Sequence, residues 1–329
     1  MTSECVEVSG HGPLWLGAQF PLRARYFPLG FPLELATNSA LVMAAAGESW
    51  GHFSRKFDAP PLELSITVDA TDKTPCALPH TPISRLQMDH LFHIVDAHNF
   101  MVSDLENGRS FGWITESTAS ATSYLRYHFL EAAGLSMISA LRAVAIHAAC
   151  ISLHGNGVLL CGDSGAGKSS LAYALALRGW TLTSDDASYL PLGRRDRLIV
   201  GNPSKIRLRS SSPKLFPELS GRPVCSRFGG KPTIEVFLNE VPGISVSDTA
   251  FIRHVIFLDR TRPSVHELRP LDKNTAFSWF RHSFLTGISS SAAQESALDH
   301  FLDVNVMRMS YQDLGWAVER LRQLVLTGA

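Results

Sequence analysis

The stretch Gly162-Asp163-Ser164-Gly165-Ala166-Gly167-Lys168-Ser169 fits the phosphate-loop pattern GxxxxGK[ST] at every fixed position. An apolar run at 158–161 precedes it and a helical pattern of leucines follows, which is the strand–loop–helix context that gives the motif meaning. The glycines permit backbone angles that a β-carbon forbids, so successive N–H groups can point at phosphate oxygens. A chance glycine-rich turn is the alternative, but it leaves the two flanking elements unexplained. The stretch therefore predicts a nucleoside triphosphate site in an α/β domain.

Two side chains of this loop have the chemistry that a bound triphosphate needs. Lys168 supplies a positive charge for the terminal phosphates, and the hydroxyl of Ser169 is a suitable ligand for magnesium. The N-terminus of the following helix adds its partial positive charge at the same place. We expect the nucleotide to be held by Gly162, Asp163, Ser164, Gly165, Ala166, Gly167, Lys168, Ser169 and Ser170.

The composition excludes several classes of protein. With 45% hydrophobic and 18% charged residues among 329, the chain has the composition of a globular protein and not of a disordered one. Thirty basic residues balance thirty acidic ones, so no global field attracts nucleic acid or an anionic membrane. None of the five cysteines falls in a CxxC pair, so neither a disulfide framework nor a zinc site is indicated.

The chain also lacks the patterns of secretion and membrane insertion. Residues 1–7 contain no basic region followed by an apolar core, so no targeting segment is expected there. The most apolar long window, 136–153, is interrupted by Arg142 and His147 and is not a spanning helix. We expect a cytoplasmic protein with neither a nucleic-acid nor a membrane partner.

The sequence pattern divides the chain into two domains. Residues 1–120 are expected to form a β-rich N-terminal domain of unknown role, because 62–68 alternates apolar and polar residues as a half-buried strand does. Helical periodicity over 121–146, with a break expected at Gly134, predicts a helical linker. Residues 121–329 comprise this linker and the nucleotide-binding domain. Further strand patterns lie at 92–95 and 111–114.

The elements next to the loop predict a mixed sheet. His154-Gly155-Asn156-Gly157 separates two apolar runs, and Asn-Gly in that position is a strong hairpin signal. A hairpin strand that leads directly into a phosphate loop differs from the parallel entry of most proteins with this motif. The remaining predicted elements are strands at 180–183 and 255–258 and helices at 274–285 and 313–326.

Three anchors resemble the catalytic domain of HPr kinase/phosphorylase, and still more the looser group of HPr-kinase-related serine kinases. They are His147, fifteen residues before the first loop glycine, the loop itself, and the pair Asp185-Asp186, which begins seventeen residues after Lys168. The resemblance covers roughly residues 141–326. It implies a mixed-sheet α/β phosphate-loop core of the type that HPr kinase shares with phosphoenolpyruvate carboxykinase.

The resemblance also implies an activity. The chain is expected to be a kinase that uses ATP and Mg2+ to phosphorylate a hydroxyl, that of a serine, on a protein or peptide acceptor, and family members assemble into homo-oligomers. It implies Lys168 and Asp185 as catalytic residues, with Asp185 the base, and Asp186 as the carboxylate on the metal side with Ser169. From the residues alone the order within the pair stays open, because adjacent strand residues point to opposite faces. His147 is either a structural histidine or a catalytic one that tunes the base or contacts a phosphate.

The chain departs from the family at one place. The family segment E-[IV]-R-G-x-G, which follows the Asp-Asp strand, is absent, and residues 201–209 read Gly-Asn-Pro-Ser-Lys-Ile-Arg-Leu-Arg instead. A phosphorylase activity is therefore not implied. Two other functions remain as alternatives: a nucleotide-binding regulatory module without catalysis, and a kinase for a small molecule.

Three further groups of basic residues are considered for a functional role. The alternating basic residues of 205–209 form either a binding face for phosphate or acidic substrate, or a solvated strand face. Arg281 is a weaker candidate for a contact with the transferred phosphate. Arg253-His254, beside a buried strand pattern, is interpreted as structural.

Overall fold

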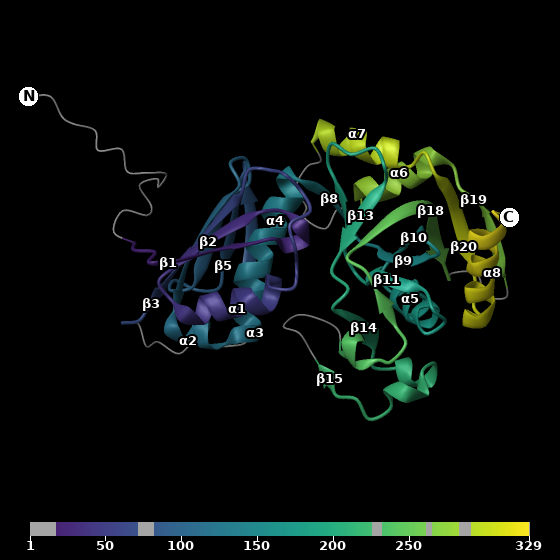
Figure 1. Cartoon of the computed structure of the whole chain (residues 1–329), viewed down its shortest axis with the longest axis horizontal. Helices are drawn as coiled ribbons and strands as arrows, with labels where there is room; N and C mark the ends of the chain where they lie inside the picture. The colour runs from purple at the N-terminus through teal and green to yellow at the C-terminus, as the bar shows by residue number, and fades with distance from the viewer. Residues whose placement is uncertain (1–17, 72–81, 226–231, 261–264, 283–290, 329) are drawn as a thin grey trace, which may run out of the picture. The chain divides into compact units, whose positions relative to one another are not determined.

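The computed structural model describes residues 18–71, 82–225, 232–260, 265–282 and 291–328 (Figure 1). Cys5, Cys76 and the N-terminal stretch searched for a targeting segment lie outside these residues. Contacts divide the chain into two compact units, Met1–Met137 and Ile138–Ala329. In the described part of the chain, no helix has both the length and the apolar character needed to cross a membrane.

The first unit contains a seven-stranded mixed sheet with the order β1-β2-β3-β7-β6-β5-β4. Strand β3 is parallel to both β2 and β7, and the other neighbours are antiparallel. The predicted alternation is present in β3, where Leu62, Leu64 and Ile66 are fully buried. The strands are β1 Leu22–Tyr26, β2 Leu33–Thr37, β3 Leu62–Asp69, β4 Ile83–Gln87, β5 His90–Ile94, β6 Phe100–Asp104 and β7 Arg109–Thr115.

The helices near the end of the first unit differ from the prediction. The expected break at Gly134 is wrong, because α4 runs through it; a Cβ there would lie 3.2 Å from the ring of Trp50, so glycine serves close packing. The prediction that the helix continues to residue 146 is also wrong, because the helix α4 ends at Leu141 and Ala143–Ile146 forms strand β8. These four residues are buried, and periodicity does not separate a buried strand from a buried helix. The helices are η2 Pro28–Gly30, α1 Ala40–Trp50, α2 Glu116–Ser120, α3 Thr122–Leu125, the π-helix η3 Arg126–Glu131 and α4 Ala132–Leu141.

The second unit is built on a ten-stranded mixed sheet with a separate three-stranded sheet. The main order is β17-β11-β9-β10-β18-β13-β12-β8, and β20 pairs with both β18 and β19. Strand β18 is parallel to both of its neighbours β10 and β20, whereas β9 is antiparallel to β10. The small sheet has the order β14-β16-β15. The predicted mixed-sheet α/β class is confirmed.

The strands of the second unit are β8 Ala143–Ile146, β9 Ala149–Leu153, β10 Asn156–Cys161, β11 Thr181–Ser184, β12 Ser188–Pro191, β13 Leu198–Gly201, β14 Lys205–Arg209, β15 Val224–Cys225, β16 Thr233–Phe237, β17 Ser245–Val246, β18 Thr249–Asp259, β19 Glu267–Pro270 and β20 Asn305–Ser310. Its helices are α5 Lys168–Ala176, η4 Ser212–Lys214, η5 Pro217–Leu219, η6 Leu238–Glu240, α6 Lys273–His282, α7 Ala292–Phe301 and α8 Leu314–Thr327.

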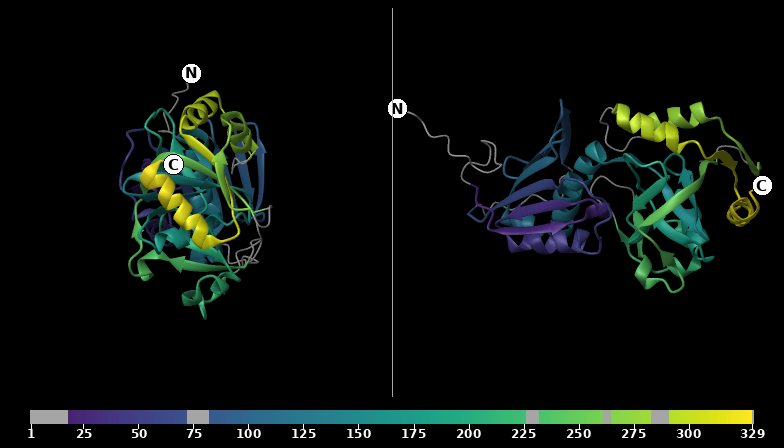
Figure 2. Two further views of the ribbon diagram at one scale, coloured as in Figure 1. Left: turned by 90° about the vertical axis from the view of Figure 1, so that its right-hand side faces the viewer. Right: turned by 45° about the horizontal axis from the view of Figure 1, so that its top comes forward.

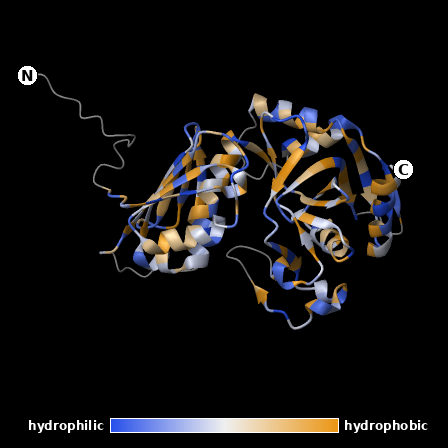
Figure 3. Cartoon of the chain, in the orientation of Figure 1, coloured by the Kyte–Doolittle hydropathy of each residue, from blue (hydrophilic) through white to orange (hydrophobic). Residues whose placement is uncertain are grey.

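Helices cover both faces of the main sheet (Figure 2). Val158 and Leu160 of β10 pack with residues of α5 and α8, whereas Leu159 and Cys161 pack with residues of α6 and α7. Because both faces of β10 are covered, its sequence is a continuous apolar run, and the sheet strands are strongly apolar in Figure 3. This three-layer packing fixes the end of β10, from which the loop begins.

The hairpin that leads into the loop is present, with its tip offset from the Asn-Gly signal. His154 and Gly155 are the turn residues, with φ of 50° and 80°, as the centre of a type I′ turn requires. Asn156 already begins β10 and pairs with Leu153. The short turn brings β9 and β10 together in register, so Cys161 ends the strand directly before Gly162.

Candidate functional site

The phosphate loop connects β10 to α5, in the order that the sequence predicts. Gly162, Gly165 and Gly167 have φ of 143°, 98° and 98°, a region that residues with a side chain rarely adopt. Gly167 caps α5, and a Cβ added to it would lie 2.6 Å from the hydroxyl oxygen of Tyr311. The loop therefore depends on glycine at 167 for two reasons, backbone angle and space.

The other predicted loop residues surround this glycine scaffold. The N–H of Ala166 donates to the carbonyl oxygen of Asp163 at 3.0 Å, which closes a turn inside the loop. Asp163 and Ser164 are exposed, and Ser170 lies half-buried in the first turn of α5. The whole segment thus sits where the sheet edge and the N-terminus of a helix meet, which is a favourable place for an anion.

Lys168 is folded back onto the loop. Its Nζ atom donates to the carbonyl oxygens of Gly162 at 2.6 Å and Asp163 at 3.3 Å, and lies 3.0 Å from Nε2 of His147. Burial lowers the pKa of Lys168, and the nearby Asp186 carboxylate opposes that change. The ammonium group is thereby held at the mouth of the loop by carbonyl oxygens, which carry no full charge.

His147 links Lys168 to the second aspartate. Since the lysine ammonium donates to Nε2, the ring proton belongs on Nδ1, from which it reaches Asp186: the carbonyl oxygen at 3.0 Å and Oδ1 at 3.2 Å. The structure thus brings His147 into the same group as the loop lysine, which its position between β8 and β9 makes possible.

Asp185 lies at the end of β11 in a buried environment. It is 7% exposed, and Oδ2 accepts the backbone N–H of Arg207 at 2.7 Å. The nearby Ser169 side chain also lowers the pKa of this carboxyl group. Oδ1 is buried and has no hydrogen-bond partner among the described residues. Burial raises the pKa of Asp185 to about 6, against the hydrogen bond from Arg207, which lowers it.

Asp186 has the opposite environment. Its side chain is 62% exposed, and the hydrogen bond from His147 holds the pKa of Asp186 below its usual value. The two adjacent carboxyl groups therefore differ in pKa, with that of Asp185 raised to about 6 and that of Asp186 lowered. Such a separation is what acid–base and charge-stabilising roles demand of a carboxylate pair.

A magnesium ion fits the oxygen atoms of this site. Mg2+ prefers hard oxygen ligands and keeps several waters, so one or two carboxylates and substrate phosphates are sufficient. The Ser169 hydroxyl and the solvent-accessible carboxylate of Asp186 supply such oxygens, and the buried carboxyl group of Asp185 lies near Ser169. Within the described ranges, no group of three or more His, Cys, Asp or Glu side chains forms an all-protein metal site.

The basic strand β14 divides its three side chains between two environments. Glu235 of β16 accepts Nζ of Lys205 at 2.7 Å and Nε of Arg207 at 2.9 Å, so both charges are paired. Arg209 is exposed, and its Nη2 lies 3.2 Å from the position that a Cβ on Gly165 would occupy. The third side chain of this predicted basic face, Arg209, therefore reaches the loop.

Sequence reasoning missed Arg260 and Tyr311. Arg260 directly follows β18, and its Nη1 lies 3.6 Å from the position of a Cβ on Gly167; its guanidinium lies 5.5 Å from the ring centre of Tyr311. The Tyr311 hydroxyl is buried without a hydrogen-bond partner in the described part of the chain. A signal existed, because β18 was a predicted buried strand, and parallel neighbours end at the same sheet edge. Arg281, by contrast, pairs with Glu295 at 3.2 Å.

The comparisons with known proteins match part of this chain. The family described as HPr Serine kinase C-terminal domain matches residues 136–208, which include His147, the loop and both aspartates. HPr kinase/phosphorylases of Thermoanaerobacter sp. (strain X514) and Thermoanaerobacter pseudethanolicus (strain ATCC 33223 / 39E) are each 41% identical over 64 residues. That match covers 20% of this chain, and the chain spans about a fifth of each relative (21%). The family resemblance is thus confirmed: the chain contains a segment of the HPr serine kinase C-terminal domain.

One solved structure is similar over a longer part of the chain. The HPr(Ser) kinase/phosphatase from Coxiella burnetii has 18% sequence identity and a TM-score of 0.28, and the match covers 55% of this chain and 96% of that one.

Proposed function

We propose that the second unit is a cytoplasmic, magnesium-dependent kinase of the HPr-kinase-related type, with a phosphate-loop core like that of HPr kinase and phosphoenolpyruvate carboxykinase. It uses ATP to phosphorylate a hydroxyl, that of a serine, on a protein or peptide. The observation that carries the proposal is the meeting of Lys168, Ser169 and Asp185 at one sheet edge. The matched domain segment supports the choice of family.

The loop and its neighbours bind the triphosphate in this proposal. Backbone N–H groups of 162–168 and the ammonium of Lys168 receive the β- and γ-phosphates, for which the lysine exchanges its carbonyl contacts. Arg209 and Arg260, which flank Gly165 and Gly167, add charge on either side. Magnesium, held through Ser169 and Asp186, would neutralise phosphate charge when bound.

Asp185 is the proposed base. Its unpartnered Oδ1 accepts the proton of the acceptor hydroxyl, whose oxygen bonds to the γ-phosphorus while the β–γ bridging bond breaks. ADP leaves with the bonding electrons. A pKa of about 6 leaves Asp185 mostly ionised at neutral pH while keeping it a useful proton acceptor. His147 orients Asp186 and Lys168 through its two ring nitrogens.

Transfer of γ-labelled phosphate from ATP to protein and peptide fractions of the source cell tests the proposal. Wild type is expected to label a serine-containing acceptor, Lys168→Ala to lose ATP binding, and Asp185→Asn to bind ATP without transfer. Labelling that survives removal of all proteins and peptides would indicate a small-molecule kinase. Unchanged cellular function of Asp185→Asn would indicate a nucleotide-binding regulator.

The same variants decide the order within the carboxylate pair. The contact between Ser169 and Asp185 also brings Asp185 to the metal-binding hydroxyl. If Asp185 is the base, Asp185→Asn lowers the transfer rate and leaves the Mg2+ requirement unchanged. If it is the metal carboxylate, higher Mg2+ concentrations restore part of the rate, and Asp186→Asn lacks that response.

A further inference from the structure

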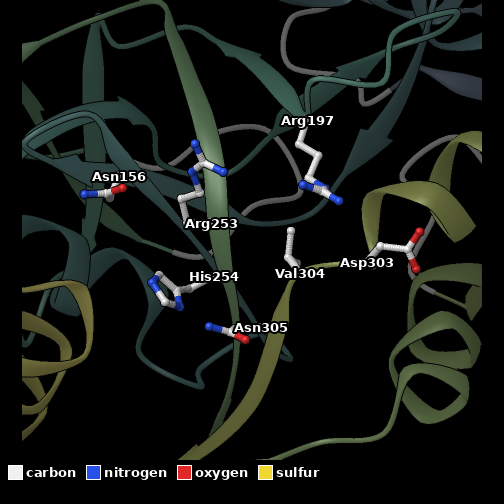
Figure 4. A pocket seen from close by; sticks show the side chains of 7 residues that line it. All are labelled: Asn156, Arg197, Arg253, His254, Asp303, Val304 and Asn305. Atoms are coloured by element: carbon white, nitrogen blue, oxygen red, sulfur yellow. The ribbon is translucent and has the colours of Figure 1, made fainter. Parts of the chain in front are cut away.

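A second pocket lies in the same unit at the other end of β10. It has a volume of about 510 Å3 and is located where β10 and β20 begin, whereas the phosphate loop follows the last residue of β10. Four separate stretches of the chain supply its side chains (Figure 4). The lining residues are Asn156, Arg197, Arg253, His254, Asp303, Val304 and Asn305.

A β-bulge places two consecutive residues of β18 in this pocket. Gly157 pairs with Ile252 and Val158 pairs with His254, so Arg253 is an extra residue that has no partner residue on β10. Consecutive strand residues normally face opposite sides, but a bulge re-aims one of them, and here both Arg253 and His254 line the pocket. Gly157 permits the close approach, since a Cβ there would lie 2.6 Å from the carbonyl oxygen of Phe251.

Arg197 reaches the pocket from the loop before β13 in an unusual backbone conformation. Its φ is 59°, which is uncommon for a residue with a side chain and marks a position to examine for function. Its carbonyl oxygen accepts the N–H of Ile252 at 3.0 Å, which fixes this loop against β18. Its Nε atom is buried and forms no hydrogen bond within the described residues.

The pocket has more hydrogen-bond donors and positive charge than its own residues use. Asp303, the carboxylate among the lining residues, already accepts Nζ of Lys273 at 2.7 Å. In the described ranges, the guanidinium of Arg253 has neither a hydrogen bond nor an ion pair. His254 is only 6% exposed, and its Nδ1 has no partner there either. The forked donors of two arginines match the geometry of a carboxylate or a phosphate.

We propose that this pocket binds a small oxyanion, a phosphate or a carboxylate, between Arg197 and Arg253. The site is separate from the phosphate loop and does not depend on the proposed kinase activity. The bulge in β18 and the left-handed Arg197 are the backbone features that accompany both arginines in the pocket lining.

Calorimetric titration of the full chain carrying Lys168→Ala tests this site apart from the loop. Inorganic phosphate and citrate are the two probes, and the tighter one identifies the ligand class. We expect saturable binding of at least one probe, weakened about tenfold or more by Arg253→Gln and by Arg197→Gln, because each removes a charge-assisted contact. Arg195→Gln, an exposed arginine of the same loop that does not line the pocket, is the matched control and should leave binding unchanged.

Several outcomes would overturn the proposal. The first is that neither probe binds saturably to the Lys168→Ala chain. The second is that the Arg197 and Arg253 variants bind with the same affinity as the control. Circular dichroism establishes whether each variant is folded. Since Arg197 and Arg253 lie on different elements, a folding defect in one variant leaves the other as the test, and Arg253→Lys, which keeps charge without the fork, should still bind more weakly.

Discussion

Gly167→Ala separates the two reasons for which the phosphate loop needs glycine. A Cβ at this position would lie 2.6 Å from the hydroxyl oxygen of Tyr311, well inside the 3.4 Å at which ordinary contact begins, and φ is 98°. The left-handed backbone costs about 1–2 kcal/mol for a residue with a Cβ. The overlap adds about 1–3 kcal/mol, as other overpacked sites do. We expect a total loss of about 2–5 kcal/mol in unfolding free energy.

Gly179→Ala is the matched control for the backbone term. Gly179 has a φ of 84°, but a Cβ there would meet nothing within 4 Å, so only the backbone cost of about 1–2 kcal/mol applies. Urea unfolding measures both variants, and ATP titration should show weakened binding for Gly167→Ala alone. Adding Tyr311→Phe to Gly167→Ala removes the contacting oxygen and should restore part of the loss. Equal destabilisation of both glycine variants, without rescue, would refute the loop geometry.

Three further predictions concern the side chains around the loop. Burial raises the pKa of Asp185 from 3.8 to about 6, so the folded state binds this proton more tightly than the unfolded state does. The unfolding free energy should therefore fall by about 3 kcal/mol as the pH rises from about 4 to about 6. Asp185→Asn should remove this pH dependence. Arg209→Gln should weaken ATP binding by calorimetry about tenfold, whereas the exposed Lys214→Gln should not; equal effects would contradict a loop contact. His147→Gln should slow phosphoryl transfer more than it weakens ATP binding, because the imidazole contacts Lys168 and Asp186 but no phosphate in the proposed site. An unchanged transfer rate would show that His147 is purely structural.

The elements that were predictable have local signals. The loop glycines, the apolar run before them and the turn signal at 154–157 each specify backbone conformation over a few residues. The C-terminal helix α8 is a similar case, since Asp313 caps it by accepting the N–H of Trp316 at 2.6 Å. Strand β8 lacked such a signal, because four buried apolar residues fit a strand and a helix equally well.

The parts of the site that were not predictable depend on distant contacts. Arg207 lies on the predicted basic strand, yet its contribution to the site is a backbone N–H that holds Asp185. Its side chain is paired with Glu235, a residue with no local signal at all. Arg253 was interpreted as structural, and the oxyanion site that we propose for it depends on the bulge that leaves it without an opposite residue on β10. Register between strands, which no single segment encodes, decided the pairing of Arg207 with Glu235 and the position of Arg253.

The pH dependence of kcat/KM for ATP hydrolysis, with water as the acceptor, tests the central claim most directly. If Asp185 takes the proton of the attacking group beside Lys168 and Ser169, kcat/KM should rise with pH through about 6. Asp185→Asn should abolish that rise and lower the rate about 100-fold or more, since a general base contributes about that much. Wild-type rates and the same pH profile in Asp185→Asn would contradict the account.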